Sequence, residues 1–297
     1  LLKDEFLLMY CDNYWPLRLK ELCRFHREHK MPATVTVYTN KHGVTKNNVR
    51  VDENGLVAFY DKTRTATGLN GVDIGFFILK KDVLKLAPDY NFSFEKEILP
   101  KLIAKKQLVG YLTCHRYYSI SSPDRLSLTA EFLSGKKIVL LDRDGVINKR
   151  ALKADYIKTW SEFEFLPGSI EAIKMLSDDG YEIYVITNQP GVARGMMTKE
   201  SLDEINQKMK EELKKNGADI NGLYQCLHGW NDGCDCRKPK PGLLYEAAFE
   251  NDFDLTKAVF IGDDERDLEA GEAAGCRTIL LKPGQGLLDV AKSLIKN

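Results

Sequence analysis

The sequence lacks a long apolar run, an excess of either charge and an N-terminal signal pattern. Its 297 residues include 43 basic and 43 acidic side chains, so the formal net charge is zero. A balanced charge gives no bulk attraction to nucleic acid or to an anionic membrane surface. No segment approaches the roughly 20 apolar residues that a membrane span requires. We therefore expect neither a nucleic acid nor a membrane as a partner.

The sequence also lacks an initiator methionine and an even number of cysteines. It begins Leu1-Leu2-Lys3-Asp4-Glu5, which we interpret as the start of an N-terminally incomplete chain. Of the seven cysteines, three lie between Cys226 and Cys236, which is a poor framework for disulfides. Free thiols persist in reducing compartments, so we expect a cytoplasmic protein.

Two α/β domains are expected, 1–134 and 135–297, because the short polar segment Ser134-Gly135-Lys136-Lys137 is typical of a junction. Apolar periodicity in the first domain predicts both strands and helices. The Asn54-Gly55 pair between two strand-like runs predicts a hairpin. The other expected elements are strands at 6–11, 33–39, 71–79 and within 108–120, and helices at 16–29, 92–104 and 123–133.

The second domain shows a regular alternation of short apolar runs with amphipathic segments. Such alternation predicts a parallel sheet covered by helices on both faces. Thr198 is expected to cap one of these helices. The expected strands are 138–141, 181–187, 223–227, 258–262 and 278–281, and the expected helices are 168–177, 198–216, 241–250 and 265–274.

Polar clusters follow several of these strands. In an open α/β sheet, ligands bind beyond the carboxyl ends of the strands, so the side chains found there are the informative ones. Four clusters are expected to converge on one rim: Asp142-Arg143-Asp144-Gly145, Thr187-Asn188-Gln189, Arg237-Lys238 and Gly262-Asp263-Asp264.

These residue types match what cleavage of a phosphate ester requires. A carboxylate such as Asp142 can attack phosphorus, and a second acid, Asp144, can protonate the leaving oxygen. Because carboxylate and phosphate repel each other, a hard dication held by oxygen ligands, among them Asp263, must lie between them. Lys238 and Thr187 would hold the transferring oxygens.

The four clusters resemble the motifs of the haloacid-dehalogenase (HAD) superfamily over about 136–297. The resemblance implies a Rossmann-like fold in which Asp142 is the nucleophile and Asp144 the general acid/base. It implies that Thr187 and Lys238 stabilise the phosphoryl group. It also implies Mg²⁺ held by the carboxylates of Asp142 and Asp263 and by the backbone carbonyl of Asp144.

A second metal is expected in the loop that precedes Lys238. Three thiols and one imidazole, the usual complete tetrahedral ligand set of a structural Zn²⁺, occur close together in this loop. Such an ion would fix the loop that aims Lys238. The expected ligands are Cys226, His228, Cys234 and Cys236.

The order Cys-x-His…Cys-x-Cys-Arg-Lys-Pro is similar to that of the heptose-bisphosphate phosphatases. The resemblance implies that Thr187-Asn188-Gln189-Pro190 and Arg237-Lys238 contact the substrate, and Asp264 stands where another contact is usual. Histidinol-phosphate phosphatases share these motifs, so the zinc loop leaves both substrate classes open. The short chain between Asp142 and Thr187 leaves no room for a cap domain.

The first domain resembles the latter part of a sugar-1-phosphate nucleotidyltransferase. The resemblance lies in Gly71-Val72-Asp73-Ile74-Gly75-Phe76-Phe77, in Phe94-Glu95 and in the segment 118–123, and it makes Asp12 a counterpart of a metal-binding aspartate. The family's Gly-rich loop is absent and Ser119 replaces a second metal-binding aspartate, so we expect no nucleotide transfer by this chain.

The pairing of these two domains favours one substrate. A sugar-1-phosphate nucleotidyltransferase and a sugar-bisphosphate phosphatase catalyse consecutive steps in making an activated heptose. We therefore expect a small phosphorylated sugar as the partner, namely a heptose 1,7-bisphosphate cleaved at C7. Histidinol phosphate, a full-length protein with both activities and a scaffold without catalysis are the alternatives. The sequence predicts no oligomeric state.

Overall fold

The computed structural model describes residues 3–16, 19–152 and 155–296. Contacts divide the chain into two compact units, Leu1–Glu131 and Phe132–Asn297, and helix α4 (Pro123–Ser134) spans the division. In the described part of the chain, no helix has the length and apolarity needed to cross a bilayer.

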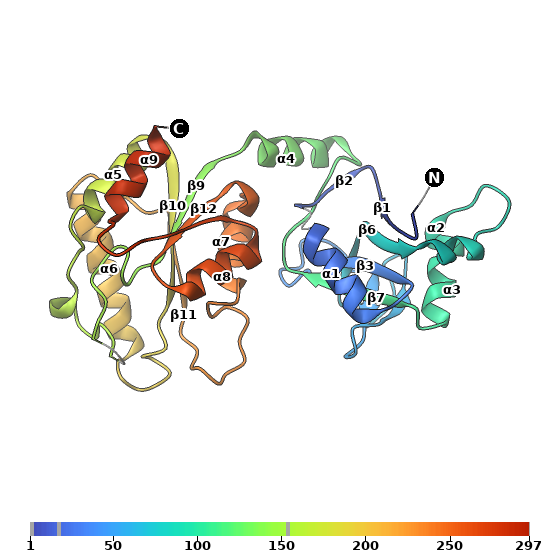
Figure 1. Cartoon of the computed structure of the whole chain (residues 1–297), viewed down its shortest axis with the longest axis horizontal. Coiled ribbons are helices and arrows are strands. Elements are labelled where there is room, and N and C mark those ends of the chain that lie inside the picture. The colour runs from blue at the N-terminus through green and yellow to red at the C-terminus, as the bar shows by residue number, and fades with distance from the viewer. Residues whose placement is uncertain (1–2, 17–18, 153–154, 297) are drawn as a thin grey trace. The chain divides into compact units, whose positions relative to one another are not determined.

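The second unit is built on a five-stranded sheet in which every pairing is parallel (Figure 1). The strand order β11-β10-β9-β12-β13 places the first strand of the unit, β9, in the centre. This sheet confirms the expected α/β architecture. The strands are β9 (Lys137–Leu141), β10 (Tyr181–Asn188), β11 (Gly222–Cys226), β12 (Val259–Gly262) and β13 (Arg277–Leu280).

Helices cover both faces of this sheet. Figure 1 shows α5 (Ser169–Asp178), α6 (Lys199–Lys215) and α9 (Leu287–Ile295) on one face, and α7 (Gly242–Asn251) and α8 (Glu265–Ala274) on the other. Successive side chains of a strand point to opposite faces. Val139 and Leu141 of β9 therefore join one buried cluster, and Ile138 and Leu140 join the other. The described part of the unit also contains two short 3₁₀ helices, at Trp160–Glu162 and Leu255–Lys257.

The structure confirms most of the elements expected in this unit, with two instructive details. Thr198 caps α6, accepting a hydrogen bond from the Ser201 amide at 3.1 Å. Helix α9 was missed in the sequence, although its buried side chains have helical spacing. Those side chains are Leu287, Val290, Ala291 and Leu294.

The first unit has a mixed four-stranded sheet, in the order β1-β6-β3-β7. Its strands are β1 (Glu5–Met9), β3 (Ala33–Tyr38), β6 (Val72–Lys80) and β7 (Leu108–Thr113). Only the β3–β7 pairing is parallel. Its remaining elements are β2 (Asn13–Tyr14), α1 (Leu19–His29), β4 (Val49–Val51), β5 (Val57–Tyr60), a 3₁₀ helix (Lys81–Leu86), α2 (Phe94–Glu97), α3 (Leu99–Ala104) and β8 (Tyr118–Ser119).

Two local features of the first unit test the sequence predictions. The Asn54-Gly55 hairpin is confirmed, because β4 and β5 pair antiparallel around it. The single helix expected at 92–104 was wrong, since Ile98 separates α2 from α3. Pro100 lies in the first turn of α3, the part of a helix where a missing backbone N–H is tolerated.

Candidate active site

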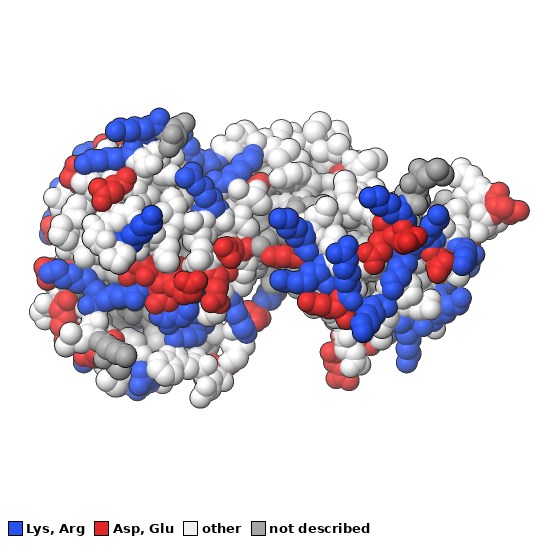
Figure 2. Space-filling view, viewed as in Figure 1, with Lys and Arg blue, Asp and Glu red and all other residues white. Residues whose placement is uncertain are grey.

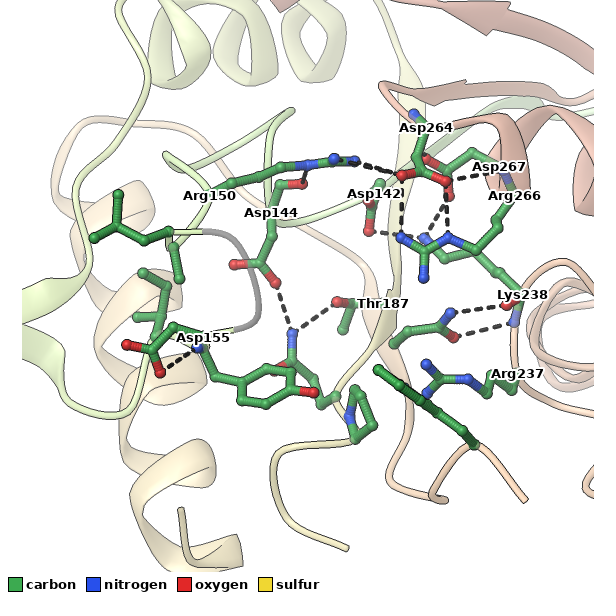
Figure 3. Close-up of a pocket in the computed structure, with 18 residues that line it drawn as sticks. Asp142, Asp144, Arg150, Asp155, Thr187, Arg237, Lys238, Asp264, Arg266 and Asp267 are labelled. Atoms are coloured by element: carbon green, nitrogen blue, oxygen red, sulfur yellow. Dashed lines mark hydrogen bonds and ion pairs between the residues drawn. The ribbon is translucent and has the colours of Figure 1, made fainter. Parts of the chain in front are cut away.

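A cavity of about 490 Å³ opens at the carboxyl ends of the parallel strands (Figure 3). Asp142 follows β9, Thr187 lies near the end of β10 and Asp263 follows β12, so the topology of the sheet brings together segments that are distant in sequence. On the face of this unit drawn in Figure 2, acidic and basic side chains are intermixed.

Lys238 forms the electrostatic centre of the cavity. Its Nζ lies 2.8 Å from Asp142 Oδ1 and 2.7 Å from Asp267 Oδ1, and it donates to the Ile186 carbonyl at 2.9 Å. Burial lowers the pKa of Lys238, but the two carboxylates more than offset this and raise it above its ordinary value. A buried cation between two carboxylates keeps its charge and compensates theirs.

The Asp142 side chain responds to the same surroundings. Burial raises the pKa of Asp142 to about 7, against the attraction of Lys238, and the Asp267 charge raises it further. Asp142 is only 7% exposed, yet it lines the cavity. Its carboxylate is therefore poised at the floor of the site, with little water around it.

The carboxylate oxygens of Asp142, Asp263 and Asp267 lie within 4.8 Å of one another. Close hard oxygen donors are the ligands that Mg²⁺ prefers. Arg150 already places a cation there, because its Nη2 lies 2.6 Å from Asp263 Oδ1 and its Nε donates to the Asp144 carbonyl at 3.2 Å. The oxygen donors of the site thus fit a cation. The Asp263 carboxylate and the Asp144 carbonyl, which Arg150 contacts, are both among the ligands that the sequence predicts for Mg²⁺.

The chain passes close to this oxygen cluster at Gly145. Its φ of +100° lies in the region that favours glycine, and a Cβ at this position would overlap the Asp263 carboxylate. Gly145 therefore allows the turn after β9 to bring Asp144 and Asp263 to the same place.

Asp144 is held by three partners around its carboxylate. Arg143 Nη2 lies 3.0 Å away, Asn148 donates at 2.9 Å and Gln189 donates at 2.7 Å. Burial raises the pKa of Asp144, but the Arg143 charge and these hydrogen bonds outweigh it and lower the pKa. Arg143 is fully buried and is fixed in turn by Asn206 at 3.0 Å. Sequence reasoning missed Arg143 and Asn148 as positioning residues.

Comparison with known proteins places this geometry in a family. The HAD-hydrolase-like family model matches residues 235–293. A D-glycero-beta-D-manno-heptose-1,7-bisphosphate 7-phosphatase from Pseudomonas aeruginosa is 42% identical over 159 residues, which are 54% of this chain and 88% of that protein. The chain belongs to the HAD-like hydrolase family. Since such relatives are phosphatases, this HAD-like hydrolase is a phosphoric monoester hydrolase.

A further relative and a solved structure are also heptose-bisphosphate phosphatases. A D-glycero-alpha-D-manno-heptose-1,7-bisphosphate 7-phosphatase from Photorhabdus laumondii is 37% identical and covers 50% of this chain and 84% of its own. The crystal structure of the D,D-heptose 1,7-bisphosphate phosphatase from B. bronchiseptica, complexed with magnesium and phosphate, matches with a TM-score of 0.51 and 35% identity. It covers 54% of this chain and 98% of its own, so the match to this HAD-like phosphatase spans about half the chain.

Asn188 and Gln189, which are expected to contact the substrate, also form hydrogen bonds to other residues of the site. Asn188 accepts from the Lys238 amide at 3.1 Å and donates to the Lys238 carbonyl at 3.0 Å. Gln189 donates to Thr187 Oγ1 at 2.9 Å as well as to Asp144. Both line the cavity, together with Pro190 and Arg237.

Asp264 lines the cavity but is bound by arginines. Arg266 donates to its two carboxylate oxygens at 2.8 and 3.0 Å, and Arg150 lies 3.4 Å away. The hydrogen bonds from Arg266 hold the pKa of Asp264 well below its usual range. Sequence reasoning missed several residues that line the cavity outside the motifs, and none of them carried a signal without the fold: Arg150, Asp155, Tyr156, Trp230 and Arg266.

The cysteine loop forms a compact cluster beside the cavity. Cys226 Sγ lies 3.8 Å from Cys234 Sγ and 3.3 Å from Cys236 Sγ, and His228 Nδ1 lies 3.6 Å from Cys226 Sγ. Tetrahedral zinc with Zn–S near 2.3 Å would place its sulfurs roughly 3.8 Å apart. The cysteines are free rather than paired in disulfides. The donor set therefore fits a closed Zn²⁺ site.

Asp12 lies in the first unit, next to the strand that contains Ser119, the residue in the place of a second metal-binding aspartate. The Ile120 amide donates to the Asp12 carbonyl at 2.9 Å, and Asn13 pairs with Ser119. Within the described residues, both groups of three or more possible metal ligands lie in the second unit, and Asp12 belongs to neither.

Proposed function

We propose that this chain removes the C7 phosphate of D-glycero-D-manno-heptose 1,7-bisphosphate through an aspartyl-phosphate intermediate on Asp142. The observation that carries the proposal is the buried Asp142 carboxylate, held by Lys238 at 2.8 Å on the floor of an open cavity. Extensive similarity to phosphatases named for this substrate supports it.

The residues divide the reaction between them. An Asp142 oxygen attacks phosphorus, the bond to the sugar oxygen breaks, and Asp144, which must be in its protonated form for this step, gives that oxygen a proton. The Asp144 carboxylate then takes a proton from water, which attacks phosphorus and releases inorganic phosphate and free Asp142. Lys238 and Thr187 hold the phosphoryl oxygens during both steps.

Two metals complete the proposal. Mg²⁺ bound by Asp142, Asp263 and the Asp144 carbonyl would offset the repulsion between nucleophile and phosphate. Zn²⁺ bound by the cluster at 226–236 would keep the loop that carries Arg237 and Lys238 in place. Asn188 would help to keep this loop in place, because its side-chain amide binds both the N–H and the C=O of Lys238.

A phosphate-release assay tests the substrate. We expect turnover of heptose 1,7-bisphosphate to exceed that of histidinol phosphate, with both anomers assayed because relatives act on either. Asp142→Asn should lower kcat by several orders of magnitude without unfolding the chain, because it removes the nucleophile. Preferred turnover of histidinol phosphate would contradict the proposed substrate, and a fully active Asp142→Asn variant would contradict the mechanism.

A further inference from the structure

A second cavity of about 400 Å³ adjoins the first in the same unit. Four residues line both cavities: Trp230, Arg237, Lys238 and Arg266. A molecule whose reacting phosphate lies at Asp142 can therefore extend past these side chains into the second cavity. The mechanism proposed above uses only Lys238 among the four.

The second cavity is cationic. Arg237, Lys238, Lys240 and Arg266 line it, and the described residues that line it include no carboxylate. Lys238 is already neutralised by Asp142 and Asp267, and Lys240 lies 3.3 Å from Asp235. Arg237 has no ion pair with any described acidic residue and donates only to the His228 carbonyl, at 3.4 Å. Its charge is thus left for a ligand.

The guanidinium of Arg266 is held in one orientation by Asp264. Two of its N–H groups, one at Nε and one at Nη2, bind the two oxygens of Asp264. A guanidinium has five N–H donors, so three remain, and Nη1 has no partner in the described part of the chain. Figure 3 shows this guanidinium extending from α8 below Asp264, on the side of the cavity where Arg237 and Lys238 lie.

Asp264 fixes both the helix and the side chain. It caps α8, accepting from the Arg266 amide at 3.1 Å, and its carboxylate then holds the Arg266 side chain two residues later. Holding a long side chain in advance lowers the entropy lost when a ligand binds. This arrangement suits a residue that recognises an anion by direction as well as by charge.

We propose that Arg266, held by Asp264, determines specificity by binding the phosphate that is not cleaved, together with Arg237. The inference rests on the proposed phosphatase function and assigns the second cavity to the second phosphate of a sugar bisphosphate. It explains how the site distinguishes a bisphosphate from its monophosphate product. The bisphosphate places one phosphate at Asp142 and the other at Arg266 and Arg237, whereas the product keeps only the second of these phosphates.

The test compares heptose 1,7-bisphosphate with heptose 7-phosphate in the full chain and in Arg266→Met. A charge-assisted hydrogen bond to phosphate corresponds to at least about tenfold in binding. We expect kcat/KM for the bisphosphate to fall about tenfold or more, mainly through KM, while kcat/KM for the monophosphate changes less than about twofold. Asp264→Asn, which keeps the helix cap, should give a smaller loss in the same direction.

Arg277→Met is the matched control. Arg277 is an exposed arginine at the N-terminal end of β13, whereas the cavity lies at the carboxyl ends of the strands and does not include it, so its replacement should leave turnover of both substrates unchanged. An unchanged ratio of bisphosphate to monophosphate turnover in Arg266→Met, or an equal loss for both substrates, would overturn the inference and leave the phosphatase function standing. Failure of the unmodified chain to hydrolyse any heptose bisphosphate would instead overturn the proposed function.

Discussion

Replacing Lys238 with methionine removes one charge from the centre of the site while keeping most of the side-chain volume. The Lys238 side chain is 3% exposed, and the side chains of its partners Asp142 and Asp267, taken without their backbone atoms, are 10% and 2% exposed. Removing one member of a buried ion pair costs about 3–5 kcal/mol, because the remaining charge stays buried without compensation. Here two carboxylates lose their common partner. We therefore expect a loss within or above that range.

Hydrogen exchange measured by mass spectrometry can locate this loss. We expect the free energy of opening to fall by about 3–5 kcal/mol for the amides of β9 and β12, which end at the site. The amides of β3 and β6, in the other unit, serve as an internal reference and should not change. Lys240→Met is the control, because Lys240 and Asp235 are 49% and 74% exposed and such a pair contributes at most about 1 kcal/mol.

A second substitution separates charge from packing. In Lys238→Met/Asp267→Asn one of the uncompensated carboxylates is gone, so the double variant should be more stable than Lys238→Met alone. If the two changes destabilise β9 and β12 additively, or if Lys238→Met costs no more than Lys240→Met, the electrostatic account of the site is refuted. Phosphatase activity should be lost in both variants that lack Lys238.

Three other predictions test separate features. Cys234→Ser should lower the bound zinc and the melting temperature together, and an unchanged zinc content would exclude the site. Arg150→Met should tighten Mg²⁺ binding about tenfold in calorimetry, because the guanidinium competes for Asp263 and the Asp144 carbonyl; weaker binding would contradict this. Burial raises the pKa of Asp73 to about 7, so the folded first unit keeps a proton that the unfolded chain releases near pH 4. Its stability should therefore fall by about 4 kcal/mol as pH rises from 4 to 7, and Asp73→Asn should abolish that slope in urea unfolding.

The arrangement of the site followed from the sequence because it depends on topology. Strands buried on both faces appear as continuous apolar runs, and alternation with helices makes the sheet parallel. Asp142, Thr187 and Asp263 each stand at or near the carboxyl end of such a strand, so their convergence required no knowledge of side-chain directions. Helix α9 follows no strand with a polar cluster at its end, and only the helical spacing of its buried side chains distinguishes it in the sequence.

The partners of each charge did not follow, because they depend on side chains that meet across long stretches of chain. Arg150 and Asp263 are 113 residues apart in sequence. Their ion pair could be predicted only from the path of the chain at Gly145, where the turn passes next to Asp263. Likewise Arg143, between two aspartates, looks like a surface residue but is fully buried. Its guanidinium donates to Asn206 of α6 at 3.0 Å, across 63 residues of sequence.

Lys238 depends on three separate parts of the fold. Asp267 binds its Nζ from α8, Asn188 binds its backbone from β10, and Cys236 of the proposed zinc site lies two residues before it. Asp267 also accepts the amides of Asp263 and Asp264 at 3.2 Å, so the start of α8 and the lysine share one carboxylate. Gly262 allows this approach, since a Cβ there would overlap Asp267. If the cluster at 226–236 binds zinc as proposed, loss of the ion should weaken catalysis by displacing Lys238, although the cluster takes no part in the chemical steps.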